Sequence, residues 1–577
     1  MDAFRINPTG GIRGLILATL LAIFAGFGIA AAPASAEKEV QLASDVNPGP
    51  SSSSPNDFVV MGDYFYFSAR GEGKGQELWR SNGTESTLVA DIKDGSSGSY
   101  PSQFTVLGDY LYFRADDEAK GIELYRTDGT QTTLVSDIAP GPDNSQPIDL
   151  TAVGGVLVFS AEDGTTGREL WRTDGMTTTQ IANIQPGGAS SNPTEFTVLG
   201  AYVYFRADDG VNGNELWRTD GSTATLWKNI YAGASGSNPS NFEEFNGSLY
   251  FRAETGGSGI EPWRTDGVTT TLLQNINGAG DSSPSNFKQM GNHLYFRATT
   301  NAAGTELWRT DGAPADVTEL VADVAPGADD SFPSDLFAVG SQLYFAAQTP
   351  ANGEELWRSD GAGADLVKDI NPGPEDSDPG RMFELDGEVY FTAENIPQGE
   401  EIWTLDGAGA KLFADVLQGE DPSEPGDFTP FKGDVYFSAN DGTHGWELFR
   451  IADIVPDTEV SIGILGSKTT LKRNGTMSLK LRCPATEESG PCAGRVSLKT
   501  KAKVKFHGKK RKVTIGSAAF SIPAGETKTL KIRPKKAVKR LLKSKRSARR
   551  VAVSAKVRDD AGNSKTATKA IRIAVAR

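Results

Sequence analysis

The sequence predicts an all-β protein in which a β-propeller is followed by a smaller β-sandwich. Three observations lead to this expectation. A string of the type ELWRTDG recurs nine times at nearly constant spacing, each period contains four short strand-like runs, and the net charge changes sign near residue 455. A chain of 577 residues is also too long for one ordinary hydrophobic core.

The repeat has a period of 45 to 49 residues, and 46 is the commonest spacing. A fixed period in this range is typical of a solenoid or a propeller, and the content of one period decides between them. The nine copies begin at Glu77, Glu123, Glu169, Glu215, Glu261, Glu306, Glu355, Glu401 and Glu447.

One period, residues 104–138, contains four runs rich in β-branched and aromatic residues: FTVL, YLYFRA, IELYRT and TTLVSDI. Gly108-Asp109 and Asp128-Gly129 separate the first and last pairs, and such dipeptides form tight hairpin turns. No helical period is present. Four antiparallel strands per period predict one propeller blade.

The two ends of the array predict how the ring closes. The last copy stops after ELFRIADI and lacks a fourth strand, whereas VQLASDVNPGP at 40–50 matches TTLVSDIAPGP at 132–142. We expect this N-terminal strand to complete the last blade. Residues 37–455 are thus predicted to form about nine four-stranded blades.

The repeated string is interpreted as structural, because a true active site does not need nine copies. Side chains alternate along a strand, so Glu215 and Trp217 should face one neighbouring blade and Leu216 and Arg218 the other. We expect the tryptophan to supply apolar contact and the glutamate and arginine to pair between blades. The structural tryptophans are Trp79, Trp171, Trp217, Trp263, Trp308, Trp357 and Trp403.

The longer loops, between the second and third strands and between successive blades, should share one face of the propeller, where binding usually resides. These loops are acidic. They could hold Ca²⁺ through carboxylates and carbonyls, or simply form a solvated face; no loop has the D-x-[DN]-x-[DN]-G spacing. The Ca²⁺ candidates are Asp163, Asp208, Asp209, Asp329 and Asp330.

No catalytic constellation is identifiable, and no cofactor is expected apart from possible Ca²⁺. Of the two propeller histidines, His293 lies in a turn and His444 in a loop of the variable face. His444 is the better catalytic candidate of the two, but simple exposure of a loop residue is the preferred interpretation. G-x-S-x-G, H-E-x-x-H and phosphate-binding motifs are absent.

Residues 1–36 resemble an export signal. Arg5 and Arg13 precede an apolar run, and Ala34-Ser35-Ala36 offers a cleavage site. An uncleaved membrane anchor is the alternative, and no further transmembrane segment follows. Export agrees with a local disulfide between Cys483 and Cys492; a metal site is the weaker interpretation.

Residues 456–577 contain 32 lysines and arginines against 7 carboxylates, a net charge of +25, whereas residues 1–455 carry −41. The segment is strand-rich, and a short helix is predicted at 537–546. In KTKAKVKF, Lys499, Lys501, Lys503 and Lys505 alternate with core-type residues along one predicted strand. An anionic cell-wall polymer or membrane surface would suit this charge. Few aromatic residues argue against nucleic acid, and docking on the acidic propeller is the competing interpretation.

The nine strings resemble those of ELWxxDGT repeat proteins, exported bacterial proteins sometimes called hyalin-like, over about residues 40–455. The resemblance implies an extracellular propeller without an established activity. The basic segment resembles the Ig-like modules appended to exported actinobacterial proteins. Departures from the motif are Asn82, Tyr125, Pro262, Ile402, Thr404 and Phe449.

Together these features favour a non-enzymatic, secreted or cell-surface protein. Its propeller would be a scaffold for a glycan or protein ligand on the acidic loop face, and its cationic Ig-like β-sandwich would associate with a surface. The alternative is an exported carbohydrate-active enzyme, a glycosidase or lyase, on the same scaffold.

Overall fold

The computed structural model describes residues 37–71, 73–312, 317–406, 409–454, 461–484, 491–558 and 564–576. The expected signal at 1–36 lies outside these residues. The chain divides into two compact units between Asp453 and Ile454, two residues from the expected boundary. Within the described residues no helix is long and apolar enough to cross a bilayer.

The described part of the first unit contains nine four-stranded antiparallel sheets, one for each sequence period. The first four are formed by β2 (Asn56–Met61), β3 (Tyr64–Arg70), β4 (Gln76–Ser81) and β5 (Ser86–Ala90); β6 (Ser102–Leu107), β7 (Tyr110–Asp116), β8 (Ile122–Thr127) and β9 (Thr132–Ser136); β10 (Ile148–Val153), β11 (Val156–Glu162), β12 (Arg168–Thr173) and β13 (Thr178–Ala182); and β14 (Thr194–Leu199), β15 (Tyr202–Asp208), β16 (Asn214–Thr219) and β17 (Ala224–Lys228).

The next four sheets repeat this order. They are formed by β18 (Ser240–Phe245), β19 (Ser248–Thr255), β20 (Gly259–Thr265) and β21 (Thr270–Leu272); β22 (Ser285–Met290), β23 (His293–Thr300), β24 (Gly304–Thr310) and β25 (Thr318–Ala322); β26 (Ser334–Val339), β27 (Gln342–Thr349), β28 (Gly353–Ser359) and β29 (Asp365–Lys368); and β30 (Gly380–Leu385), β31 (Glu388–Asn395), β32 (Gly399–Asp406) and β33 (Gly409–Ala414).

The ninth sheet combines the two ends of the array. It contains β34 (Gly426–Phe431), β35 (Asp434–Asn440) and β36 (Trp446–Asp453), and β1 (Lys38–Ser44) pairs antiparallel with β36. Residues of β1 therefore take the position that β5 has in the first sheet. The predicted closure by the N-terminal strand is confirmed.

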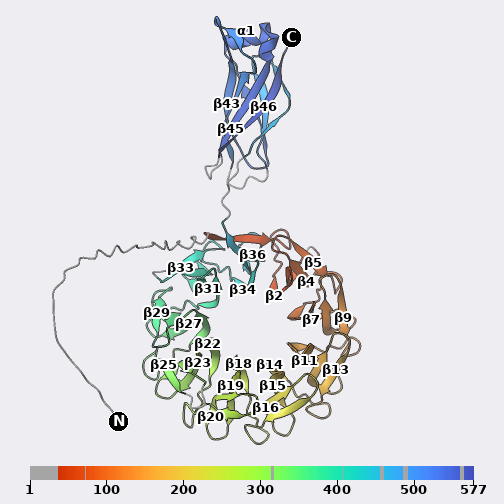
Figure 1. Cartoon of the computed structure of the whole chain (residues 1–577), viewed down its shortest axis with the longest axis vertical. Helices are drawn as coiled ribbons and strands as arrows, with labels where there is room; N and C mark the ends of the chain where they lie inside the picture. The colour runs from red at the N-terminus through yellow and green to blue at the C-terminus, as the bar shows by residue number, and fades with distance from the viewer. Residues whose placement is uncertain are drawn as a thin grey trace, which may run out of the picture. The chain divides into compact units, whose positions relative to one another are not determined.

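The sheets are arranged around a ring, with strands such as β2, β18 and β34 on the inside and β5, β13 and β29 on the outside (Figure 1). Each inner strand contacts the inner strand of the next sheet, and β34 contacts β2, so the circuit is complete. The expected propeller is confirmed. Its core lies between neighbouring sheets, where hydrophobic clusters combine residues of both.

The second unit has two larger sheets and a two-stranded ribbon. One sheet contains β37 (Gly463–Leu465), β39 (Met477–Arg482) and β44 (Thr527–Ile532); the other contains β38 (Lys468–Leu471), β46 (Ser564–Val575), β45 (Arg550–Arg558), β40 (Cys492–Thr500) and β43 (Thr514–Ile522). The ribbon pairs β41 (Val504–Phe506) with β42 (Lys509–Arg511). Residues of both larger sheets share one hydrophobic core.

Helix α1 (Lys536–Ser544) and the 3-10 helix η1 (Arg546–Arg549) connect β44 of one sheet to β45 of the other. The predicted short helix is present, and its Val538, Leu541 and Leu542 are buried on one face. The predicted disulfide is present: Cys483 is bonded to Cys492, and both side chains are buried.

One prediction for this unit is wrong. KTKAKVKF is not a single strand, because β40 ends at Thr500 and the ribbon begins at Val504. The Thr500 hydroxyl donates to the carbonyl of Ala502, 2.9 Å away, and accepts from the N–H of Val513. Ala502 is consequently exposed rather than in the core, although Lys499, Lys501, Lys503 and Lys505 are all exposed as expected.

Candidate functional site

The glutamate of the repeated string holds the loop that leads to the next sheet. Glu215, fully buried in β16, accepts hydrogen bonds from the N–H groups of Ile230, Tyr231 and Ser237. The Ser237 hydroxyl donates to the same carboxylate at 2.6 Å. Since loop N–H groups have no strand partner, a buried acceptor is required to satisfy them.

This glutamate–serine pair recurs in every sheet of the ring. The pairs are Glu77–Ser99, Glu123–Ser145, Glu169–Ser191, Glu215–Ser237, Glu261–Ser282, Glu306–Ser331, Glu355–Ser377, Glu401–Ser423 and Glu447–Ser53. We call them the Glu–Ser pairs. The serine was missed in the sequence, although a signal exists: each of these serines begins an S-x-P triplet.

Burial raises the pKa of all nine glutamates above its ordinary value, and the hydrogen bonds that each carboxylate accepts offset only part of this effect. The pKa of Glu401 is raised to about 7, with a smaller contribution from the nearby charge of Asp415. These carboxylates are occupied by the loops and are not open to a substrate.

The other motif side chains join neighbouring sheets in the predicted directions. Trp217 packs with Phe205 against Val158 of the preceding sheet, whereas Leu216 packs against Phe251 of the following one. The indole Nε1 of Trp217 is buried without a hydrogen-bond partner. This tryptophan therefore contributes apolar contact.

The expected pairing of motif glutamate with motif arginine is wrong. Arg218 lies over the rings of Tyr202 and Trp227, at 4.2 and 3.6 Å from their centroids, and donates to the carbonyl of Gly267 in the next sheet. Arg80 and Gly129 repeat this bond at 2.8 Å. The glutamate carboxylate already accepts hydrogen bonds from the loop, and the arginine instead donates to the carbonyl of the Asp-Gly turn of the next sheet.

The glycine of that turn is required by its surroundings. Gly129 has φ +88°, and a Cβ at this position would collide with the hydroxyl of Tyr66. The Asp128 carboxylate accepts hydrogen bonds from the N–H groups of Thr130 and Gln131. The Thr130 hydroxyl also donates to this carboxylate, and its bond, together with those two, lowers the pKa of Asp128 to about 2. The glutamate, leucine, tryptophan, arginine, aspartate and glycine of the motif therefore all have a structural role in the ring.

The acidic loops use their carboxylates in a similar way. Asp163 accepts from the N–H groups of Thr165 and Thr166, and Asp209 from those of Val211 and Asn212. Asp208 accepts from Gly210 and Asp330 from Thr305, while the carbonyl of Asp329 lies close to Gly304. The described residues contain no group of three or more Asp, Glu, His or Cys arranged to hold a metal ion.

His444 lies in such a loop and contacts Asp441, with 2.7 Å between Nδ1 and the carboxylate. This contact raises the pKa of His444. Asp441 also accepts hydrogen bonds from the N–H groups of Thr443 and His444, so the pair closes its own loop. His293 begins β23 and lies edge-on to Tyr295.

The inner strands carry polar residues at one position that recurs in every repeat. Each of these strands has a bulge at which one residue adopts a left-handed backbone, with φ between 48° and 65°. The bulge residues are Asp57, Gln103, Asp149, Glu195, Asn241, Asn286, Asp335, Arg381 and Asp427. Gln103 accepts from the N–H of Asp149, and Glu195 from that of Asn241, so bulges of successive sheets are joined.

Two pockets open beside these bulges. One of about 380 Å³ is lined by Asp335, Glu354, Arg381 and Glu400, and burial with neighbouring carboxylates raises the pKa of Glu354. The other, of about 450 Å³, is lined by Asp57, Arg114 and Tyr100. Tyr100 is 58% exposed, so its aromatic ring is accessible to solvent. Its backbone has φ +51°, a strained conformation for a residue other than glycine.

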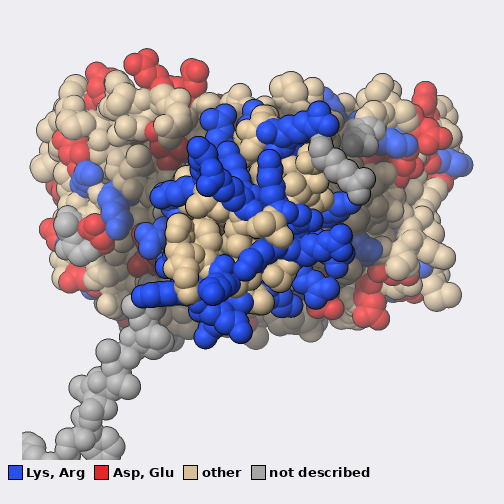
Figure 2. Space-filling model, turned by 90° about the horizontal axis from the view of Figure 1, so that it is seen from above, with Lys and Arg blue, Asp and Glu red and all other residues tan. Residues whose placement is uncertain are grey.

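The second unit concentrates positive charge. Figure 2 shows lysine and arginine side chains gathered over it. Within its described residues, 461–484, 491–558 and 564–576, Glu526 is the only carboxylate. Over residues 456–577 as a whole, the sequence has 32 lysines and arginines against 7 carboxylates, so positive charge is in large excess.

Comparisons with known proteins add little beyond the fold. No family model and no curated protein matches the chain. Among solved structures, a puromycin-hydrolyzing peptidase of Mycobacterium tuberculosis is 13% identical, with a TM-score of 0.31, and 59% of this chain matches 57% of the peptidase. The β-propeller domain of the Trilobed protease from Pyrococcus furiosus is 11% identical, with a TM-score of 0.29, 56% of this chain covering 100% of the domain. The extracellular domain of BT4673 from B. thetaiotaomicron is 10% identical, with a TM-score of 0.26, over 90% of this chain and 81% of that one.

Proposed function

We propose that this chain is an exported, non-enzymatic surface protein of the ELWxxDGT repeat type. A nine-bladed propeller serves as a binding scaffold, and a cationic, Ig-like module associates with an anionic polymer of the cell surface. The observation that carries the proposal is the charge of residues 456–577, which contain 32 lysines and arginines against 7 carboxylates, a net charge of +25.

A polyanion satisfies such a surface because the many cations lose mutual repulsion when it binds. Nucleic acid fits less well, since the unit has only two phenylalanines and no tyrosine or tryptophan. Phe520 is buried, and Phe506 is half-buried. Base stacking on aromatic side chains therefore has at most one platform.

For the propeller, the constant positions of the repeat build the ring and the bulge positions differ from sheet to sheet. A glycan or protein ligand in the pockets beside the bulges would contact these differing side chains, which would set its specificity. The role of these pockets in binding rather than hydrolysis is tested by incubating the chain with polysaccharides and measuring both retention and released sugar. Release of reducing sugar would overturn the non-enzymatic assignment.

Surface association is tested by sedimentation of the full chain with purified bacterial cell wall. Binding should fall steeply between about 0.05 and 0.5 M salt, because the screening length shortens from roughly 14 to 4 Å. Changing Lys501, Lys503 and Lys505 together to Gln should weaken it at low salt. The matched control changes Lys228, Lys288 and Lys411 of the propeller to Gln and should bind as the parent does.

Wall binding that ignores salt, or an equal loss in the two triple variants, would contradict surface association through the second unit. A full chain that does not sediment with wall at low salt would contradict it as well.

A further inference from the structure

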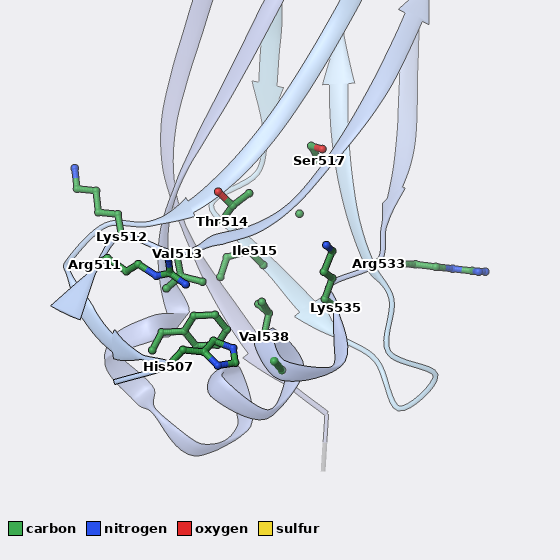
Figure 3. Close-up of a pocket in the computed structure, with 13 residues that line it drawn as sticks. His507, Arg511, Lys512, Val513, Thr514, Ile515, Ser517, Arg533, Lys535 and Val538 are labelled. Atoms are coloured by element: carbon green, nitrogen blue, oxygen red, sulfur yellow. The ribbon is translucent and has the colours of Figure 1, made fainter. Parts of the chain in front are cut away.

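A pocket of the basic unit lies where β41, β42, β43 and the start of α1 meet. It has a volume of about 620 Å³. Val513, Ile515 and Val538 form an apolar floor, and Phe506 and His507 form one wall, with their ring centroids 4.3 Å apart. Figure 3 shows His507, Ile515, Val538 and Lys535 around the same space.

The cations that line this pocket are of two kinds. Arg511 and Lys535 lie on opposite sides of Ile515 and Val538 in this view, and Arg511 extends toward Val513 (Figure 3). The guanidinium of Arg511 lies over the ring of Phe506, 5.6 Å from its centroid. Lys512 and Arg533 extend away from the pocket in the same view. All four cations are exposed.

These walls suit a ligand that combines an anion with a ring bearing hydroxyl groups. The floor residues are at most 6% exposed, so little apolar surface is available to an acyl chain. Thr514 and Ser517 supply exposed hydroxyls on the lining. An aromatic wall, hydroxyl groups and cations beside a shallow apolar floor match the CH face, the hydroxyls and the charge of an acidic sugar unit.

We propose that this pocket binds one repeating unit of an anionic sugar polymer. The sugar ring lies against Phe506 and His507, and its phosphate or carboxylate lies between Arg511 and Lys535. This inference rests on the proposed association with an anionic surface polymer, and adds a defined site and a ligand class to it. Cations elsewhere on the unit contribute long-range attraction that does not distinguish one polyanion from another.

The test compares two double variants of the full chain that remove the same charge. Arg511→Gln with Lys535→Gln removes the cations of the pocket; Lys512→Gln with Arg533→Gln removes the cations that extend away. Three probes are immobilised: polygalacturonate, a purified sugar–phosphate wall polymer, and inorganic polyphosphate, which has charge but no sugar.

The pocket pair should lose about tenfold or more in affinity for at least one sugar polymer, and the outward pair much less. Both pairs should lose equally on polyphosphate. Which sugar polymer responds identifies the anion as carboxylate or phosphate. Equal losses of the two pairs on all three probes would overturn the pocket while leaving surface association intact, whereas a parent chain that binds no probe at low salt would remove both.

A second variant changes the wall without changing the number of lysines and arginines. His507 has φ +51°, and asparagine, like histidine, is among the non-glycine residues that adopt this backbone most readily, so His507→Asn is expected to fold. It should weaken binding of the responding sugar polymer and leave polyphosphate binding unchanged. Unchanged binding of every sugar polymer would contradict contact of the sugar with this wall.

Discussion

Ser53 is hydrogen-bonded to Glu447 although 394 residues separate them in sequence. The serine hydroxyl lies 2.6 Å from one carboxylate oxygen, and its N–H donates to the other at 2.8 Å. The same pair joins each of the other eight sheets to its outgoing loop. Tyr436 reinforces this junction by donating to the carbonyl of Gly83 at 3.0 Å. The junction between the two ends of the array is therefore built like the interior ones.

The first prediction concerns closure. A chain that begins at residue 45, and so lacks β1, should unfold at a lower temperature than one that begins at residue 37. Loss of β1 leaves unpaired those N–H and C=O groups of β36 that face β1 rather than β35, and such an open strand edge favours aggregation. Thermal unfolding followed by circular dichroism and light scattering measures both effects.

Ser53→Ala and Ser237→Ala form a matched pair for the same junction. Each should cost about 1–2 kcal/mol of unfolding free energy, because each leaves a buried carboxylate with one donor fewer. Closure would be disproved by equal melting temperatures of the chains with and without β1.

The second prediction concerns pH. Because burial raises the folded-state pKa of the nine motif glutamates above 4.5, the folded protein holds protons that the unfolded chain has released. The contribution of each raised pKa to the free energy of unfolding is largest below the pKa of the glutamate in the unfolded chain. It is lost as pH rises through the pKa in the folded protein, which is about 7 for Glu401. Urea unfolding should therefore give a higher free energy at pH 5 than at pH 8.

Two further observations limit the size and the pH range of this change in stability. Glu401 alone contributes about 3 kcal/mol at most, and Glu401→Gln should flatten the slope between pH 5 and 8. Turn aspartates such as Asp128 and Asp220, whose pKa is about 2, act oppositely and lower stability only as pH falls below about 4. Stability that stays constant or rises from pH 5 to 8 would refute the raised pKa values.

The third prediction concerns the motif tryptophan. Trp217→Ala should cost roughly 3 kcal/mol, at the lower end for a large aromatic, because Trp217 is only partly buried. The matched change is Trp227→Ala: this tryptophan lies outside the motif and its Nε1 donates to Thr265 and Thr270. Ligand affinity of the folded Trp217→Ala protein should be unchanged; a loss of affinity without a loss of stability would make the motif a binding site.

The fourth prediction concerns the disulfide. Cys483→Ala with Cys492→Ala should destabilise the second unit by about 2–3 kcal/mol, because the bridge closes a short loop of sequence separation 9. Calorimetry should show a lower transition for this unit and an unchanged transition for the propeller. A shift of the propeller transition would show that the two units unfold together.

Much of the propeller could be predicted because its signals are local. Asp-Gly and Gly-Asp turns, alternation along each strand and a constant period depend on neighbours within one sheet. The likeness of 40–50 to 132–142 was enough to predict the position of β1, since a strand with the same pattern fills the same position. Even the faces of Trp217 and Leu216 followed from alternation alone.

The partner of each motif glutamate could not be predicted in this way. Charge complementarity suggested arginine, but the glutamate instead satisfies N–H groups of a folded loop, whose demand for an acceptor arises only when the next sheet packs against it. The S-x-P triplets carried this information without showing which residue they contact. In KTKAKVKF, alternation was overridden by the hydrogen bonds of Thr500 with Ala502 and Val513.

The sequence by itself determined the order of strands within each propeller sheet, the ring's closing strand, the disulfide and the separation of acidic from basic residues, because each depends on local pattern or composition. Only the tertiary structure decided which polar groups form hydrogen bonds within the protein and which remain accessible to a ligand. The motif glutamates became buried loop acceptors, whereas Phe506, Arg511 and Lys535 came together in a pocket because β41, β42, β43 and α1 pack around one core.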